Sequence, residues 1–141
     1  SSSNLATVLA VASSQRCDIF ELTDGAELKC LYRLKCHSRV ITDIDWSSQQ
    51  PSLLATSSFD SYVHIWDIRV PRQAVTEKPQ QSLSALDGAS QVRWNKWKTD
   101  TLASCDGGHV KIWDMRKPNL PSEYIAAHAS KINGNFGPKK F

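Results

Sequence analysis

The chain has 141 residues, of which 40% are hydrophobic and 22% charged, and its formal net charge is +3. A surplus this small argues against a nucleic-acid partner, and the sequence lacks the apolar run of about 18 residues that direct insertion into a membrane requires. The four cysteines form no Cys-x-x-Cys pair, so we expect reduced thiols in a cytoplasmic setting, with no metal site and no disulfide framework.

The first part of the chain predicts strands joined by one tight turn. Residues Leu5–Phe20 carry a strand pattern, and Leu28–Leu34 reads as a further, outer strand. Between them lies Thr23-Asp24-Gly25, whose Asp-Gly pair is typical of turns that need a positive φ.

The central part predicts three more strands, with the strongest pattern at the end. An inner strand is expected over Val40–Trp46, followed by Leu53–Ser58 and Tyr62–Trp66. In the last of these, Val63 and Ile65 share one face while His64 and Trp66 share the other. Large side chains on both faces predict a sheet that is covered on both sides.

The stretch from Leu102 to Arg116 repeats this central pattern. Trp66 and Trp113 lie 47 positions apart, and a worn copy of the pattern ends at Phe20, 46 positions before Trp66. Self-similarity at a fixed period indicates that one supersecondary unit is stacked repeatedly. Between the copies, Val70–Ser82 predicts an exposed loop. Further strands are expected over 82–86, 91–94, 101–105, 109–113 and 124–126.

Strands that end in Ile-Trp-Asp at this period resemble the WD-repeat β-propeller family, which implies an all-β fold. Seven blades of ~45 residues need roughly 315 residues, so 141 residues predict a partial propeller with about three blades of an expected seven. The expected division is the end of one blade (1–36), a complete repeat (37–86), a degenerate repeat (87–126) and the start of the next repeat (127–141).

The same resemblance implies a structural tetrad of hydrogen-bonded side chains within a blade. The matching positions are His37, Thr56 or Ser57, Asp60 and Trp66, and Ser57 is the assignment adopted here for the hydroxyl. A buried Asp and His need partners, which such a chain supplies. A Ser-His-Asp catalytic arrangement is the alternative reading, and the Trp at the family's offset favours the structural one.

In the next repeat the equivalents are Asp106 and Trp113, but no histidine precedes Gln91, so this tetrad is expected to be incomplete. No nucleophile, metal cluster or phosphate loop stands outside the repeat pattern. We therefore expect no enzymatic activity, no cofactor and no small-molecule substrate.

Both good repeats continue past Trp-Asp to arginine, as Asp67-Ile68-Arg69 and Asp114-Met115-Arg116. Residues two apart on a strand point to the same side, so each aspartate can brace its arginine. One interpretation is a surface ion pair worth ~0–1 kcal/mol. The other is a docking element, because tandem Trp-Asp-x-Arg repeats resemble substrate receptors of cullin–RING ubiquitin ligases.

Three segments resemble a narrower group, the WD-repeat subunits of GATOR complex 2; they are His37–Trp46, Gly88–Lys96 and Glu123–Ile132. This resemblance implies a non-catalytic scaffold that binds other subunits of a multiprotein complex. It also implies positive regulation of TOR kinase signalling in response to amino acids, with peripheral attachment to the lysosomal or vacuolar membrane through the complex. The ubiquitin-ligase receptor remains the alternative.

Overall fold

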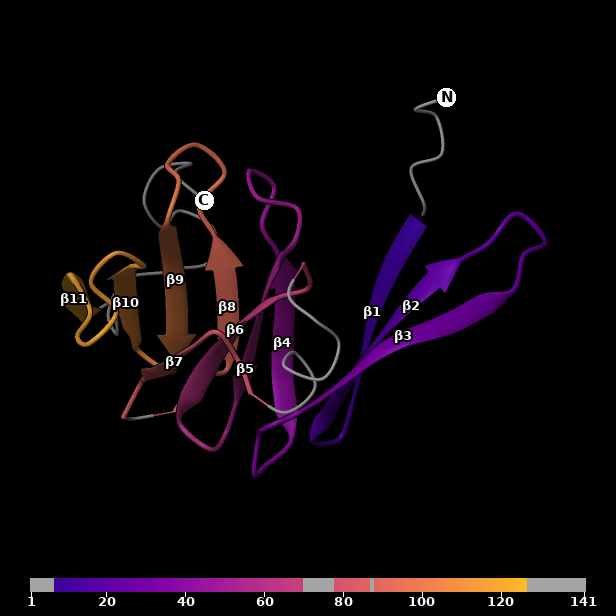
Figure 1. The fold of residues 1–141 in the computed structure, drawn as a ribbon. Helices are drawn as coiled ribbons and strands as arrows, with labels where there is room; N and C mark the ends of the chain where they lie inside the picture. Colours follow the sequence, from indigo (N-terminus) through magenta and orange to yellow (C-terminus); the bar gives the residue numbers. More distant parts are fainter. Residues whose placement is uncertain (1–6, 70–77, 87, 127–141) are drawn as a thin grey trace.

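The computed structural model describes residues 7–69, 78–86 and 88–126, which form eleven strands in three antiparallel sheets (Figure 1). The first sheet has three strands, β1 (Thr7–Ser13), β2 (Arg16–Leu22) and β3 (Leu28–Lys35). The second has four, β4 (Ile41–Trp46), β5 (Leu53–Ser58), β6 (Tyr62–Asp67) and β7 (Gln81–Ser84). The third also has four, β8 (Gln91–Trp94), β9 (Thr101–Asp106), β10 (His109–Asp114) and β11 (Glu123–Ala126).

Each sheet is a meander in which consecutive strands pair with one another. The all-β architecture of about three blades is thereby confirmed, and each strand lies close to its predicted place. Of the loop predicted over Val70–Ser82, residues 70–77 lie outside the described residues, and its last two residues instead begin β7. The further repeat predicted over 127–141 also lies outside the described residues. Among the residues that the structure describes, no helix is long and apolar enough to span a membrane.

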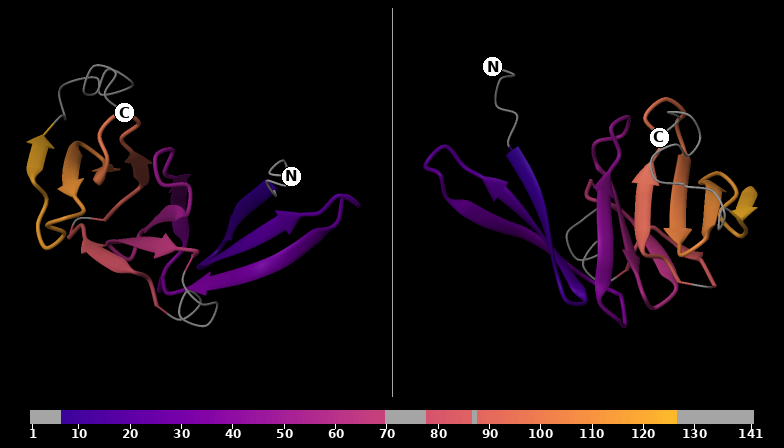
Figure 2. Two further views of the ribbon diagram at one scale, coloured as in Figure 1. Left: turned by 45° about the horizontal axis from the view of Figure 1, so that its top comes forward. Right: turned by 180° about the vertical axis from the view of Figure 1, so that it is seen from behind.

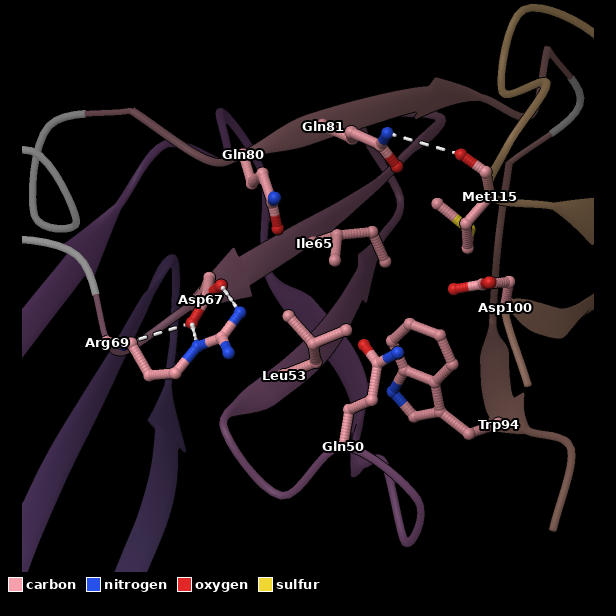
Figure 3. A pocket seen from close by; sticks show the side chains of 10 residues that line it. All are labelled: Gln50, Leu53, Ile65, Asp67, Arg69, Gln80, Gln81, Trp94, Asp100 and Met115. Atoms are coloured by element: carbon pink, nitrogen blue, oxygen red, sulfur yellow. Dashed lines mark hydrogen bonds and ion pairs between the residues drawn. The ribbon is translucent and has the colours of Figure 1, made fainter.

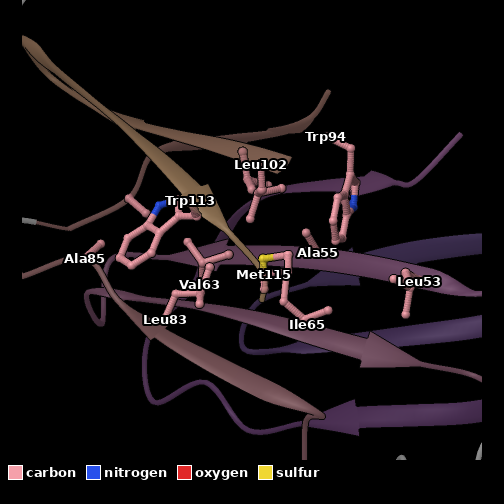
Figure 4. Close-up of a cluster of buried hydrophobic side chains, with 12 residues drawn as sticks. Leu53, Ala55, Val63, Ile65, Leu83, Ala85, Trp94, Leu102, Trp113 and Met115 are labelled. Atoms are coloured by element: carbon pink, nitrogen blue, oxygen red, sulfur yellow. The ribbon is translucent and has the colours of Figure 1, made fainter. Parts of the chain in front are cut away.

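The three sheets follow one another in chain order, and the first is inclined away from the other two (Figure 2). The second and third sheets pack face to face around one hydrophobic cluster (Figure 4). Val63 and Ile65 of β6 contribute to this cluster from one side, and Leu102 and Trp113 from the other. Burying side chains of this size contributes roughly 1.5–3 kcal/mol each.

A second cluster joins the first and second sheets. Leu54 and Trp66 pack there against Cys17, Ile19 and Leu34 of the first sheet. Neighbouring residues of β5 and β6 therefore enter different clusters, because successive side chains of a strand point to opposite faces. The prediction that this sheet is covered on both sides is correct.

Carboxylates on β4 also connect the second sheet to the third. Asp43 Oδ2 accepts the Val92 backbone N–H at 3.0 Å and the Arg93 guanidinium at 2.6 Å. Asp45 Oδ2 accepts the Trp94 backbone N–H at 2.8 Å. These bonds satisfy backbone donors of β8 that have no strand partner on that side.

The turn between β2 and β3 corrects one expectation. The Ala26 backbone N–H donates to the Thr23 carbonyl at 2.9 Å, as a tight turn requires. However, the positive φ belongs to Ala26, at 62°, and not to Gly25. The left-handed residue is therefore one position later than the Asp-Gly pair suggests.

Candidate functional site: a buried polar chain and an exposed rim

A continuous chain of hydrogen bonds crosses the interior of the second sheet. His37 Nδ1 lies 2.9 Å from Asp60 Oδ2, and His37 Nε2 lies 2.8 Å from Thr56 Oγ1. The Trp66 indole N–H donates to the same Thr56 oxygen at 3.1 Å. These residues come from the β3–β4 connection, β5, the β5–β6 turn and β6, so the chain ties together segments that are distant in sequence.

The donors define the direction of this chain. Because Trp66 donates to Thr56, the Thr56 hydroxyl is available to donate to His37 Nε2, and His37 then donates its Nδ1–H to Asp60. Asp60 also accepts the Ser38 backbone N–H at 2.9 Å and, through Oδ1, the Tyr62 backbone N–H at 3.0 Å. Each polar group in the chain thus has a partner.

Burial and hydrogen bonding have opposite effects on the pKa values of His37 and Asp60. Burial lowers the pKa of His37, and the hydrogen bond to Asp60 only partly offsets it, so the ring is neutral at pH 7. Burial would raise the pKa of Asp60, but the hydrogen bonds from His37 and the Ser38 N–H outweigh it and bring that pKa below its ordinary value. The stable arrangement is a carboxylate beside a neutral imidazole.

The hydroxyl in this chain is that of Thr56, which corrects the assignment of Ser57. Ser57 Oγ instead lies 2.9 Å from Thr42 Oγ1, on the side of the third sheet. Thr56 pairs with His64 in the sheet and so shares the face of Trp66. Two adjacent hydroxyl residues necessarily point to opposite faces of the strand, and the register of the sheet selects Thr56.

The residue types match a hydroxyl–His–Asp catalytic set, but the Thr56 hydroxyl is not accessible to a substrate. Thr56 has 0% of its surface exposed and is held between an indole and an imidazole. A nucleophile must reach the substrate atom that it attacks. This hydroxyl cannot do so in the folded sheet.

The third sheet contains only part of the corresponding hydrogen-bond network. The Trp113 indole N–H donates to Ser104 Oγ at 2.9 Å, which repeats the Trp66–Thr56 contact. Asp106 lies half-buried beside Gly88, whose φ is 99°, and no histidine precedes β8 at the position that His37 has before β4. Lys111 is buried at the position that corresponds to His64 and donates to the Ala85 carbonyl.

His64 is a buried partner that the sequence did not assign. Its ring stacks on His37 with centroids 4.2 Å apart, and its Nδ1 lies 2.9 Å from Ser82 Oγ. Burial, together with the neighbouring His37, lowers the pKa of His64 to about 4. The alternation in Tyr62–Trp66 was the available signal, because it puts His64 on the face of Trp66.

His37, Asp60 and His64 each offer an atom to a metal ion, and these atoms lie within 4.8 Å of one another. Both ring nitrogens of His37 are already engaged, by Asp60 and Thr56. Metal binding would therefore break the polar chain. The donor set fits a structural hydrogen-bond network better than a metal site.

The two Asp–Arg pairs form forked ion pairs at the opposite end of the strands. Arg69 donates through Nε and NH2 to Asp67, at 3.0 and 2.7 Å, while its side chain remains 73% exposed (Figure 3). Arg116 repeats this geometry on Asp114, at 3.0 and 2.9 Å, with 71% exposed. Hydrogen bonds from Arg116 lower the pKa of Asp114 to about 2. The two pairs follow equivalent strands, β6 and β10, so the four residues for which docking was considered lie at the same end of their sheets.

Sheets that meander outward, stack face to face and recur with a buried tryptophan define the WD40 class of repeat protein. A family model for "WD domain, G-beta repeat" matches residues 28–67. The chain belongs to the WD40-repeat family. Its repeated sheets and its tryptophan contacts extend the likeness to the third sheet.

Relatives of known name share much of this sequence. The chain is 50% identical over 125 residues to "GATOR2 complex protein WDR59" of Gallus gallus and 47% identical over 131 residues to the protein of that name in Homo sapiens. These alignments cover 89% and 93% of the chain but only 12% and 13% of the relatives. It is also 38% identical over 124 residues to a "RWD, RING finger and WD repeat-containing protein" of Schizosaccharomyces pombe, covering 86% of the chain and 9% of that protein.

Proposed function

We propose that this chain is part of the propeller of a GATOR2-like scaffold subunit, and that the whole protein acts by holding other subunits together without catalysis. The similarity to GATOR2 complex proteins carries this proposal, because 47–50% identity extends over about nine-tenths of the chain. It therefore includes the third sheet, where the polar chain lacks its histidine.

The complex positively regulates TOR kinase signalling in response to amino acids under this proposal. The protein is then cytoplasmic and reaches the lysosomal or vacuolar membrane through its complex. Its partners are other protein subunits, and the surfaces that meet them are the rims and loops of the propeller. The buried polar chain of His37, Thr56, Asp60 and Trp66 has the structural role of fixing the blade that carries those surfaces.

A second candidate is a substrate receptor of a cullin–RING ubiquitin ligase. The observation that favours it is the pair of exposed, forked arginines on one rim, Arg69 and Arg116. Arginine is a frequent hot-spot residue, and losing one costs 2 kcal/mol or more at many interfaces. In this case the arginines bind an adaptor propeller.

One experiment separates the two candidates. The full-length protein is affinity-purified as wild type and with Arg69→Ala and Arg116→Ala combined. The scaffold proposal expects GATOR2-type subunits with both proteins, and a blunted TOR response to returning amino acids when the protein is removed. Recovery of a cullin adaptor that disappears in the double variant, with no GATOR2-type subunit, supports the ligase candidate and overturns the first.

A further inference from the structure

The turn between β8 and β9, residues 95–100, holds a large aromatic side chain out in solvent. Trp97 is 75% exposed, whereas Trp66, Trp94 and Trp113 are buried. Lysines 96 and 98 flank it and are exposed as well. Surface tryptophans are unusual because their apolar area is large, and they are enriched at the centres of protein interfaces.

This turn is preorganised. The Asn95 side-chain carbonyl accepts the backbone N–H groups of Trp97 at 2.7 Å and of Lys98 at 2.9 Å. Gln49, from the corresponding turn of the second sheet, donates through Nε2 to the Lys96 carbonyl at 2.8 Å. The presentation of Trp97 is therefore built into the backbone, so binding through it costs little ordering entropy.

The turn that carries Trp97 has more bases than acids, because Lys96 and Lys98 flank the tryptophan. The turns at this end of the second and third sheets carry five exposed bases, Arg69, Lys96, Lys98, Arg116 and Lys117. Four acids lie in the described residues of the same turns and the adjoining strand ends (67–69, 95–100 and 114–123): Asp67 and Asp114, which pair with the two arginines, Asp100, and Glu123 at the start of β11. Asp100 and Arg69 face each other across a crevice of about 130 Å³ (Figure 3), so the fork and the Trp97 turn belong to one surface.

From this we infer that the Trp97 turn, with the basic rim around it, is a docking surface for an acidic protein segment that carries apolar side chains. The inference rests on the proposed scaffold function and names the chemistry of one partner. Trp97 supplies the apolar anchor, and the lysines and arginines receive carboxylates. Such a contact is small and salt-sensitive, as expected of a regulated interaction.

An anionic bilayer fits this surface less well. Arg69 and Arg116 donate hydrogen bonds from Nε and NH2 to aspartates, and these ion pairs weaken their electrostatic attraction to a diffuse negative surface. Their NH1 groups still offer directed donors to a placed carboxylate. Besides Trp97, the exposed apolar residue of these turns is Leu120, and so little apolar area gives weak membrane anchoring.

The test uses the full-length protein and a fluorescent peptide that alternates glutamate with leucine and phenylalanine. Two control peptides replace its glutamates by lysine or its apolar residues by glutamine. We expect binding of the first peptide alone, weakened by salt and weakened about tenfold or more by Trp97→Ala or by Lys96→Glu with Lys98→Glu. Trp97→Phe should restore most of it. Leu86→Ala, at an equally exposed apolar residue of the opposite rim (77%), is the matched control and should change nothing.

Equal binding of all three peptides, or no binding of any, overturns the inference. So does a preference for phosphatidylserine vesicles that depends on Trp97 in the same way. Co-purification of GATOR2-type subunits is followed separately in each variant. Retained subunits with lost peptide binding leave both proposals standing, and peptide binding without those subunits contradicts the scaffold proposal alone.

Discussion

The Asp45 carboxylate accepts the backbone N–H of Trp94 at 2.8 Å across the boundary between the second and third sheets. The Trp94 indole N–H returns the contact by donating to the Asp45 carbonyl at 3.0 Å. A backbone donor on an inner strand is thereby satisfied by a side chain 49 residues away. The position of one sheet against the next is therefore fixed by such hydrogen bonds as well as by the packing of apolar faces.

Asp45→Ala should lower the stability of the propeller by roughly 1–3 kcal/mol, because it leaves the buried Trp94 N–H without an acceptor. Thermal unfolding of the full-length protein measures this. Asp24→Ala, in the exposed turn between β2 and β3, is the control and should stay within about 0.5 kcal/mol. An equal effect of the two substitutions would contradict the role given to Asp45.

Asp60→Ala should also cost roughly 1–3 kcal/mol, because it removes the acceptor of the His37 Nδ1–H and of two backbone N–H groups. The matched control is Asp106→Ala, at the corresponding turn of the third sheet, because no histidine precedes β8 at the position that His37 has before β4. We expect a clearly smaller loss there. Urea unfolding followed by tryptophan fluorescence compares the two, and equal midpoints would refute the assignment of Asp60 to a blade-stabilising chain.

The pH dependence of stability should reveal the buried His64. Burial and the adjacent His37 lower its pKa to about 4 in the folded protein, against about 6.5 when unfolded. The unfolded state then binds more protons between these values, so stability is complete above about pH 6.5 and declines as the pH falls toward 4. The loss attributable to this group is on the order of 3 kcal/mol.

His64→Gln should flatten that decline, because an amide can still bond Ser82 but does not take up a proton. Unfolding midpoints measured from pH 7.5 to 4.5 provide the comparison. A profile that is equally steep with and without the His64 ring would show that other groups govern the acid sensitivity.

The isolated chain of 141 residues should associate in solution. Leu9 and Val11 on β1 are 42% and 49% exposed, on the face turned away from the second sheet, and Tyr124 and Ile125 on β11 are 52% and 39% exposed. Apolar strands at open ends of a sheet array promote self-association. Size-exclusion chromatography should show oligomers or aggregates. A single monomer peak that unfolds cooperatively would mean that three sheets suffice.

Much of this architecture follows from the sequence by itself. The recurrence of Ile-Trp-Asp between Trp66 and Trp113 predicted stacked sheets, because a repeated unit buries its apolar faces only against its neighbours. Alternation within Tyr62–Trp66 assigned Val63 and Trp66 to opposite faces, since the period of a strand is two residues. The spacing of aspartate and arginine also pointed to the ion pair of Asp67 and Arg69, although for the wrong reason: β6 ends at Asp67, and a turn in which the Arg69 backbone N–H donates to Asp67 Oδ1 brings the two side chains together.

Tertiary structure alone decided which groups meet across distant strands. Thr56 and Ser57 are adjacent hydroxyl residues, and only the register against His64 determines which one faces Trp66. The bonds from Asp43 and Asp45 to β8 depend on how two sheets are placed, which no local pattern records. Local periodicity is set by the geometry of one strand, whereas these contacts depend on closing loops of many residues, so they exist only once the sheets have packed.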